Sequence, residues 1–213
     1  ELFAQDHHEN LVRHNQKAAR RSNTTWAPTK TKKLPNSIYQ FKITLLDSKP
    51  KIWRRIQVTD CKLDTLHYHI QAVMGWTNNH LHHFIIGRER YGIPKWLDDE
   101  FLGSKVIDST KILLSDLLAN AGKKFAFEYL YDMGDNWEHE ILFEGIVAPD
   151  AKTKYPVCVE GERAGPPEDI GGVPGYEHLL EVLQDPSLEE YPDALSWVGE
   201  DFDPERFDPG LAT

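Results

Sequence analysis

Two segments in which large apolar side chains alternate with other residues constrain the fold of this 213-residue chain more than any other feature. Residues 125–131 place Phe or Tyr at every second position, and residues 137–143 alternate in the same way across a short polar turn. Because successive side chains of a strand point to opposite faces, this period predicts an antiparallel hairpin with one aromatic face. Such a face can stack nucleobases, but no Lys or Arg interrupts it to meet phosphates, so we expect buried core.

A second hairpin and a helix are expected on the N-terminal side of this segment. Residues 38–45 and 52–58 alternate around a turn that contains Pro50, which is typical of two paired strands. Asp64 is expected to cap the N-terminus of a helix that Gly75 ends. Its apolar residues recur at helical spacing, so one face should pack on the sheet.

The remaining patterns are shorter and place helices at the end of the chain. Strands are expected at residues 80–86, 87–93, 106–107 and 157–159, and helices at residues 113–118, 176–183 and 188–198. Hairpins followed by helices predict an α+β fold. We expect a mixed or largely antiparallel sheet built from two β-hairpin groups, with packed helices and a C-terminal helical acidic segment.

Charge is distributed unevenly along the chain. Residues 1–34 carry seven Lys or Arg against three acidic residues, whereas residues 160–213 carry two Arg against fifteen acidic residues. We expect residues 1–36 to form a basic, flexible N-terminal arm, residues 37–208 one α+β domain, and residues 209–213 a tail. The net charge of −10 disfavours nucleic acid as a partner of the whole chain. The basic stretch 11–33 could still contact a nucleic acid or a protein, although a solvated linker is the simpler interpretation.

Cysteine content and hydropathy indicate the compartment. Cys61 and Cys158 cannot form a disulfide scaffold and lack the paired spacing of a zinc knuckle, so we expect a reducing, cytoplasmic setting. No apolar run approaches the roughly 20 residues of a membrane span, so no membrane association is expected.

The turn of the aromatic hairpin carries more polar chemistry than a turn requires. Asp132, Asp135 and Asn136 are ordinary turn residues, because their side chains bond the local backbone. His139 follows within reach, and a carboxylate beside an imidazole fixes its tautomer and raises its basicity. Asp132, Asp135 and His139 are therefore candidate catalytic or metal-binding residues.

A second cluster, His80 to His83, offers metal ligands. On a strand, His80 and His82 would share one face, which is a workable spacing for joint ligation of a divalent metal. The sequence lacks a zinc-binding motif such as HExxH, so satisfied polar histidines are the alternative interpretation. Cys158 completes the set of candidate metal ligands.

A third cluster lies in the Gly- and Pro-rich loop 161–175. Proline fixes φ and glycine permits positive φ, so the loop should hold one defined path. Glu168 and Asp169 on that path are candidate acid–base residues. The alternatives are that they cap the following helix or form salt bridges with Arg54, Arg55 or Arg163.

These clusters, in this order, carry a resemblance to a known family. The matching segments include Ile38 to Ile43 with Ile52 to Arg55, Leu66-His67 with Ile70 to Trp76, His80 to His82 with Phe84, Tyr131 to His139, Pro166 to Asp169 with Gly171-Gly172, and Phe202 to Asp208. Over residues 37–208 the chain resembles the plasmid Ri third-open-reading-frame-like family, whose members are also labelled insertion-sequence passenger proteins. The resemblance implies an α+β fold and a location on plasmids or mobile elements, without an established activity.

Two positions depart from the family pattern. Met133 stands where Phe is usual, and Gly165 stands where a cysteine is common before the Pro-Pro-Glu-Asp stretch. The second departure argues against a thiolate metal centre in this chain.

Three functions remain open from the sequence. The chain is expected to be a noncatalytic accessory or binding protein that acts on a protein or nucleic acid. The first alternative is a metal-dependent hydrolase that uses His80, His82, Asp132, Asp135 and His139 with Glu168 or Asp169. The second is a purely structural interaction module. We expect spatial convergence of the three clusters if they form a site, and dispersal if they are scaffold.

Overall fold

The computed structural model describes residues 37–97, 105–119, 121, 125–210 and 212. The basic arm expected over residues 1–36, including the stretch 11–33, lies outside the described residues. Among the described residues, no helix is long and apolar enough to cross a membrane.

Within the described part of the chain, eight strands form one sheet. They are β1 (Ile38–Leu45), β2 (Trp53–Thr59), β3 (His82–Ile86), β4 (Glu89–Gly92), β5 (Val106–Asp108), β6 (Phe125–Tyr131), β7 (Trp137–Val147) and β8 (Val157–Glu162). Their spatial order is β5-β4-β3-β6-β7-β1-β2-β8, and β4–β5 is the one parallel pair in it. The α+β class and the largely antiparallel sheet are therefore confirmed.

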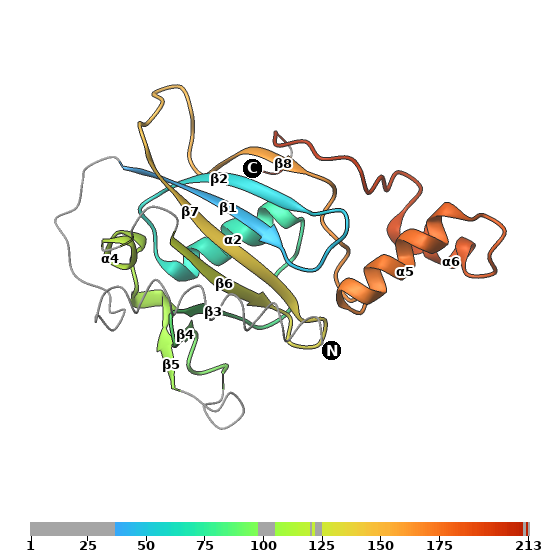
Figure 1. The fold of residues 1–213 in the computed structure, drawn as a ribbon, viewed down its shortest axis with the longest axis horizontal. Helices are drawn as coiled ribbons and strands as arrows, with labels where there is room; N and C mark the ends of the chain where they lie inside the picture. Colours follow the sequence, from blue (N-terminus) through green and yellow to red (C-terminus); the bar gives the residue numbers. More distant parts are fainter. Residues whose placement is uncertain (1–36, 98–104, 120, 122–124, 211, 213) are drawn as a thin grey trace.

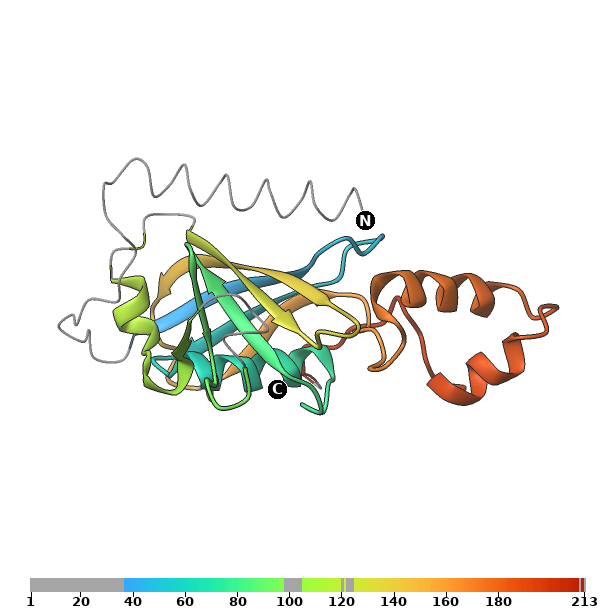
Figure 2. The ribbon, with the colours of Figure 1, turned by 90° about the horizontal axis from the view of Figure 1, so that it is seen from below.

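The three longer helices occupy two places in the described structure. α2 (Leu63–Met74) lies along one face of the sheet, whereas α5 (Gly172–Gln184) and α6 (Tyr191–Val198) extend away from it as a helical pair (Figures 1 and 2). The short η1 (Ser109–Lys111) and α4 (Leu114–Leu118) follow β5. α6 has no buried residue, whereas α5 contributes Tyr176 and Leu179 to the core.

The aromatic face of the β6–β7 hairpin is buried core, as expected. Phe127, Tyr129 and Tyr131 on β6 are fully buried, as are Trp137 and Ile141 on β7. They pack in the same cluster as the apolar face of α2, because that helix covers this side of the sheet. A nucleobase-stacking platform on this face is therefore excluded.

Several expected boundaries were wrong. Asp64 is not the N-cap of α2: the helix begins at Leu63, its N-cap is Lys62, and Asp64 lies in the first turn. A carboxylate there still interacts favourably with the positive end of the helix dipole. Gly75 does end the helix, at φ 81°. The expected strand 80–86 begins only at His82, so His80 lies in the preceding loop.

A buried arginine joins the sheet to the end of α2. Arg54 on β2 is 1% exposed. Its Nε donates to the carbonyl of Val73 at 2.7 Å, and its Nη1 donates to the carbonyls of Trp53 and Glu162 at 2.9 and 2.8 Å. The ring of Phe207 covers the guanidinium at 3.9 Å. Burial lowers the pKa of Arg54 to about 10, so it stays charged at neutral pH.

Replacing Arg54 should therefore destabilise the protein strongly. Arg54→Met leaves buried carbonyls without donors, and each such group costs about 1–3 kcal/mol; we expect a loss of about 3 kcal/mol or more in the free energy of unfolding. Arg54→Lys should recover part of it, since an ammonium cannot reproduce the planar fork. The neighbouring Arg55 pairs with Glu144 and Glu160 near the surface, so Arg55→Met should cost less than about 1 kcal/mol. Equal losses for the two Met variants in urea denaturation would contradict this role.

Candidate functional site

Three loops meet at one end of the sheet. The first follows α2, the second is the β6–β7 turn, and the third is the Gly- and Pro-rich loop between β8 and α5. These are the three segments that carry the polar clusters of the sequence. Each loop is held by its own contacts, and together they determine which side chains come close.

The first loop is fixed by Trp76. Its indole ring is stacked on Tyr131 with 5.0 Å between ring centroids, and its Nε1 donates to the carbonyl of Pro166 at 2.9 Å. The tight C-terminal turn at Gly75 thus directs Trp76 into the core before the chain returns to the surface at Thr77.

The second loop is a turn built by its own Asx residues. Asp132 and Asn136 have positive φ angles of 55° and 56°, a conformation that Asp and Asn tolerate better than most residues. The Asp132 Oδ1 accepts from the amide of Gly134 at 2.8 Å. The Asp132 amide donates to the carbonyl of Leu81 at 2.9 Å, which ties this turn to the first loop.

The third loop is tied to both others by two acidic side chains. Glu168 accepts from the Thr77 amide at 2.9 Å and from the hydroxyls of Thr77 and Tyr131. Burial opposes ionisation of Glu168, but these hydrogen bonds outweigh it and lower its pKa. Asp135 accepts from the Gly171 amide at 3.1 Å. Among the described residues, Arg55 and Arg163 pair with other glutamates, so neither Glu168 nor Asp169 forms the salt bridge with arginine that the sequence left open.

Close backbone packing explains why glycine stands at position 165. A Cβ atom at Gly165 would lie 2.0 Å from the carbonyl oxygen of Met74. The loop therefore packs directly on the end of α2 without space for a side chain. A cysteine at this position would require the backbone to shift.

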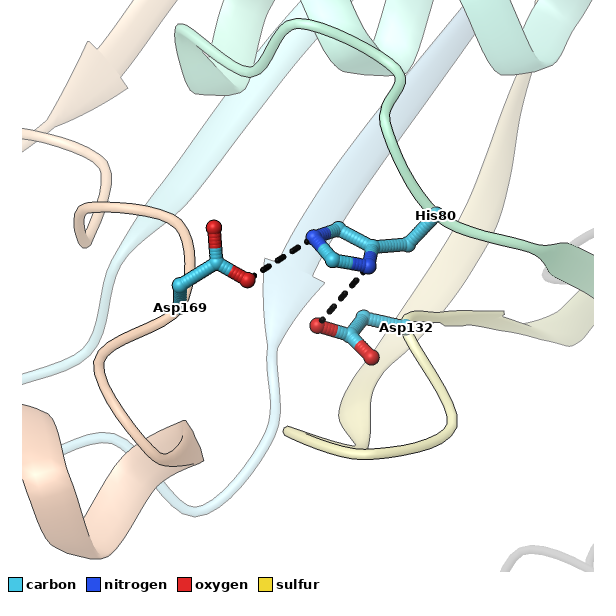
Figure 3. A group of neighbouring side chains, drawn as sticks. All are labelled: His80, Asp132 and Asp169. Carbon is cyan, nitrogen blue, oxygen red and sulfur yellow. Dashed lines mark ion pairs between the residues drawn. The ribbon is translucent and has the colours of Figure 1, made fainter.

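The loops bring His80, Asp132 and Asp169 together (Figure 3). The Nε2 of His80 lies 3.0 Å from Asp169 Oδ1, and its Nδ1 lies 3.6 Å from Asp132 Oδ2. One potential ligand atom from each residue lies within 4.8 Å of the others. Among the described residues, this is the one such group of His, Cys, Asp and Glu.

The surroundings of these three residues differ. Asp132 is 7% exposed, whereas the side chain of Asp169 is 68% exposed and has a φ of 61°. The His80 Nε2 is shielded from solvent but makes no hydrogen bond, although the Asp169 oxygen is within ion-pair distance. That oxygen therefore lies off the N–H direction, and both atoms remain available to a shared ligand.

The expected pairing of His80 and His82 on one strand face was wrong. His82 lies in β3, and its ring is stacked on His67 with 3.4 Å between centroids and an interplanar angle of 4°. Burial lowers the pKa of His82 to about 2 and that of His67 to about 4, so both are neutral at physiological pH. Because His80 precedes the strand, its ring is free to turn toward the other two loops.

His67 is part of a hydrogen-bond network that the sequence did not reveal. Its Nε2 lies 2.6 Å from Asn78 Oδ1, and its Nδ1 lies 2.7 Å from the Tyr129 hydroxyl. A neutral imidazole must donate to the amide oxygen and accept from the hydroxyl, which leaves Tyr129 to accept from Gln71 at 3.1 Å. The network holds the loop at Asn78 onto α2.

The expected pairing of His139 with the turn carboxylates was also wrong. His139 points into the core, where it is fully buried beside Trp76 and Tyr129, at 5.4 Å between ring centroids in each case. Its Nδ1 faces the carbonyl of Trp137 at 3.1 Å. The strand period explains this, because residue 139 shares the face of Trp137 and Ile141.

Cys158 is likewise separate from the cluster. It lies on β8 opposite Ile56, its thiol donates to the carbonyl of Glu160 at 3.5 Å, and burial raises its pKa. Of the sequence candidates, His80, Asp132 and Asp169 thus form the cluster, and Asp135 and Glu168 tie its loops. His82, His139 and Cys158 lie in the core.

A cleft of about 660 Å³ opens beside the cluster. Its lining includes His80, Asp132 and Met133 from the first two loops, and Ile93, Trp96 and Leu97 from the segment after β4. Trp96 is 55% exposed, which is unusual for a tryptophan. The sequence analysis missed it, because the short segment after β4 has no periodic pattern.

The fold and this arrangement define an α+β protein with a histidine–carboxylate cluster at the meeting point of three loops. The family of plasmid pRiA4b ORF-3-like proteins matches residues 37–210, and the chain belongs to that family.

Two relatives support the assignment. The chain is 38% identical over 164 residues to the uncharacterized protein y4hQ of Sinorhizobium fredii, covering 76% of this chain and 81% of that protein. It is 40% identical to a protein of unknown function, MM3350 from Methanosarcina mazei Go1. That crystal structure aligns with a TM-score of 0.72 over 82% of this chain and 96% of the other.

The buried histidines predict acid destabilisation. Burial lowers the pKa of His139 to about 4, below the ordinary histidine value of 6.5. As pH falls through this window, the unfolded chain binds a proton that the folded chain excludes, so stability present above pH 6.5 is lost toward pH 4. For His139 alone the loss is about 3 kcal/mol.

We expect His139→Gln to flatten the dependence of the unfolding free energy on pH between 6.5 and 4. His178→Gln serves as the control, since His178 is exposed and pairs with Glu190 at the surface. Identical slopes for wild type and His139→Gln would contradict a buried neutral imidazole.

Proposed function

We propose that this protein binds a divalent metal ion through His80, Asp132 and Asp169, and that the ion serves a noncatalytic binding function in the adjoining cleft. The observation that carries the proposal is the convergence of three ligand atoms, from three separate loops, within 4.8 Å of one another. An ion about 2.0–2.4 Å from each ligand can span that separation.

The ligand chemistry favours a borderline or hard cation. One imidazole and two carboxylates suit Zn²⁺ or Mn²⁺, whereas thiolate-preferring ions lack a sulfur ligand here because Cys158 belongs to the core. The His80 ring has a carboxylate near each nitrogen, and the bond-free Nε2 is the nitrogen nearer Asp169. His80 would bind through Nε2, with oxygens of Asp169 and Asp132 completing three protein ligands.

The hydrogen bonds of the other acidic candidates, Glu168 and Asp135, favour metal binding over metal-dependent hydrolysis. A metal-dependent hydrolase needs a general base within reach of the attacking water. Glu168 is occupied by Thr77 and Tyr131, and Asp135 accepts from Gly171. Both candidates therefore act as loop ties in this proposal.

Hydrolysis remains the second candidate because the cluster adjoins an open cleft. A metal with three protein ligands keeps positions for water and substrate.

A role in binding nucleic acid would depend on residues 11–33. Its signature would be salt-sensitive binding of DNA or RNA by the full chain that is lost when residues 1–36 are removed.

Isothermal titration of tag-free protein with Zn²⁺ and Mn²⁺ tests the site. We expect one equivalent of one of these ions to bind, and His80→Gln, Asp132→Asn and Asp169→Asn each to weaken affinity at least about tenfold. His178→Gln is the matched control, because the His178–Glu190 pair at 3.2 Å is an exposed histidine–carboxylate contact outside the cluster. Sub-stoichiometric metal, or equal affinities across the set, would overturn the proposal.

The catalytic alternative has its own test. With the metal bound, we expect no turnover of p-nitrophenyl acetate or p-nitrophenyl phosphate above the level of the Asp169→Asn variant. Metal-dependent turnover that the three cluster variants abolish, while His178→Gln retains it, would replace the noncatalytic function with a hydrolase.

A further inference from the structure

We propose that the cleft beside the cluster binds a small molecule with a flat aromatic body and a carboxylate head, and that the head coordinates the metal. This inference rests on the proposed metal site and adds the class of its ligand. It is carried by the composition of the cleft, whose lining combines an apolar segment with polar loop residues.

The segment after β4 supplies an apolar part of the lining with an exposed aromatic ring. Ile93, Trp96 and Leu97 form this part, and Met133 on the hairpin turn also lines the cleft. The turn after β4 is closed by hydrogen bonds from the amides of Trp96 and Leu97 to the carbonyl of Ile93, at 2.9 and 3.2 Å. Leu97 is 4% exposed and anchors this turn, so Trp96 is presented by an ordered backbone.

The remaining residues that line the cleft supply polar groups without a positive charge. Of the described residues that line the cleft, none is Lys or Arg, and Asp132 is the acidic one. An anionic head group would therefore be repelled by the bare protein. A bound divalent ion offsets the charges of Asp132 and Asp169 and leaves coordination positions for a carboxylate. Ligand binding should thus require the metal.

The dimensions of the cleft fit this class of ligand. Its volume of about 660 Å³ lies within the range of about 300–1,000 Å³ that is typical of small-molecule sites. A planar ring beside an indole gains offset stacking in addition to the burial of apolar surface. The metal determines where the head lies, and Trp96 determines where the ring lies.

The probe is 2-naphthoate, with 2-naphthylmethylamine as the cationic counterpart of the same ring. Titrations of the Zn²⁺- or Mn²⁺-loaded full chain are followed by calorimetry, and for the Zn²⁺ form also by the indole N–H signals in NMR spectra. We expect 2-naphthoate to bind, to shift the Trp96 signal and to require the metal. Trp96→Ala should weaken binding at least about fivefold. Trp197→Ala is the matched control, since Trp197 is 51% exposed on α6.

The outcomes separate this inference from the proposed function. Stoichiometric metal binding with no response to 2-naphthoate overturns the ligand class and leaves the metal site in place. Binding of 2-naphthoate without metal, or tighter binding of the amine to metal-free protein, overturns the coordination of the head group. Equal effects of Trp96→Ala and Trp197→Ala overturn the assigned cleft.

Discussion

The site depends on the buried guanidinium of Arg54. Through Val73 and Glu162 it binds the last turn of α2 and the end of β8, which are the starting points of two of the three loops. A buried cation without a carboxylate partner is tolerated because oriented carbonyl dipoles replace water, and those at a helix C-terminus carry partial negative charge. Gly165 against Met74 and Trp76 against Pro166 then bring the same two loops into contact. The position of His80 relative to Asp169 thus follows from contacts in the core.

The alternation of apolar residues along the sequence predicted those strands and helices whose formation depends on neighbouring residues. The alternation in residues 125–131 and 137–143 predicted the hairpin and its buried face, because a strand has a period of two. The N-terminus of α2 was misplaced, since Asp64 is also favourable in a first turn and the N-cap Lys62 makes no side-chain capping bond that its residue type could signal. The parallel pairing of β4 with β5 joins segments separated by residues 93–105, and no local pattern encodes that choice.

The candidate site was predictable as a set of segments but not as a set of side chains. His80, Asp132 and Asp169 were all candidates, and each of the three clusters contributed one residue. Residue type alone could not separate them from His82 and His139. The environment of His82 depends on where the strand begins, whereas the alternation of residues 137–143 already places His139 on the buried face. Because β3 starts at residue 82, the His82 ring lies in the core and His80 lies in the preceding loop. Trp96 gave no signal, since its exposure is a tertiary property.

Burial divides the histidines of this region into two chemical classes. His67, His82, His83 and His139 are buried, and desolvation lowers the pKa of each, so they act as neutral polar parts of the core. His80 is the one among these five whose ring lies partly open to solvent, with a carboxylate near each nitrogen. A neutral buried imidazole without a route to solvent cannot exchange a ligand. The same chain therefore uses histidine for packing inside the sheet, and the proposed ion would meet the partly exposed member of these five histidines at the loop end.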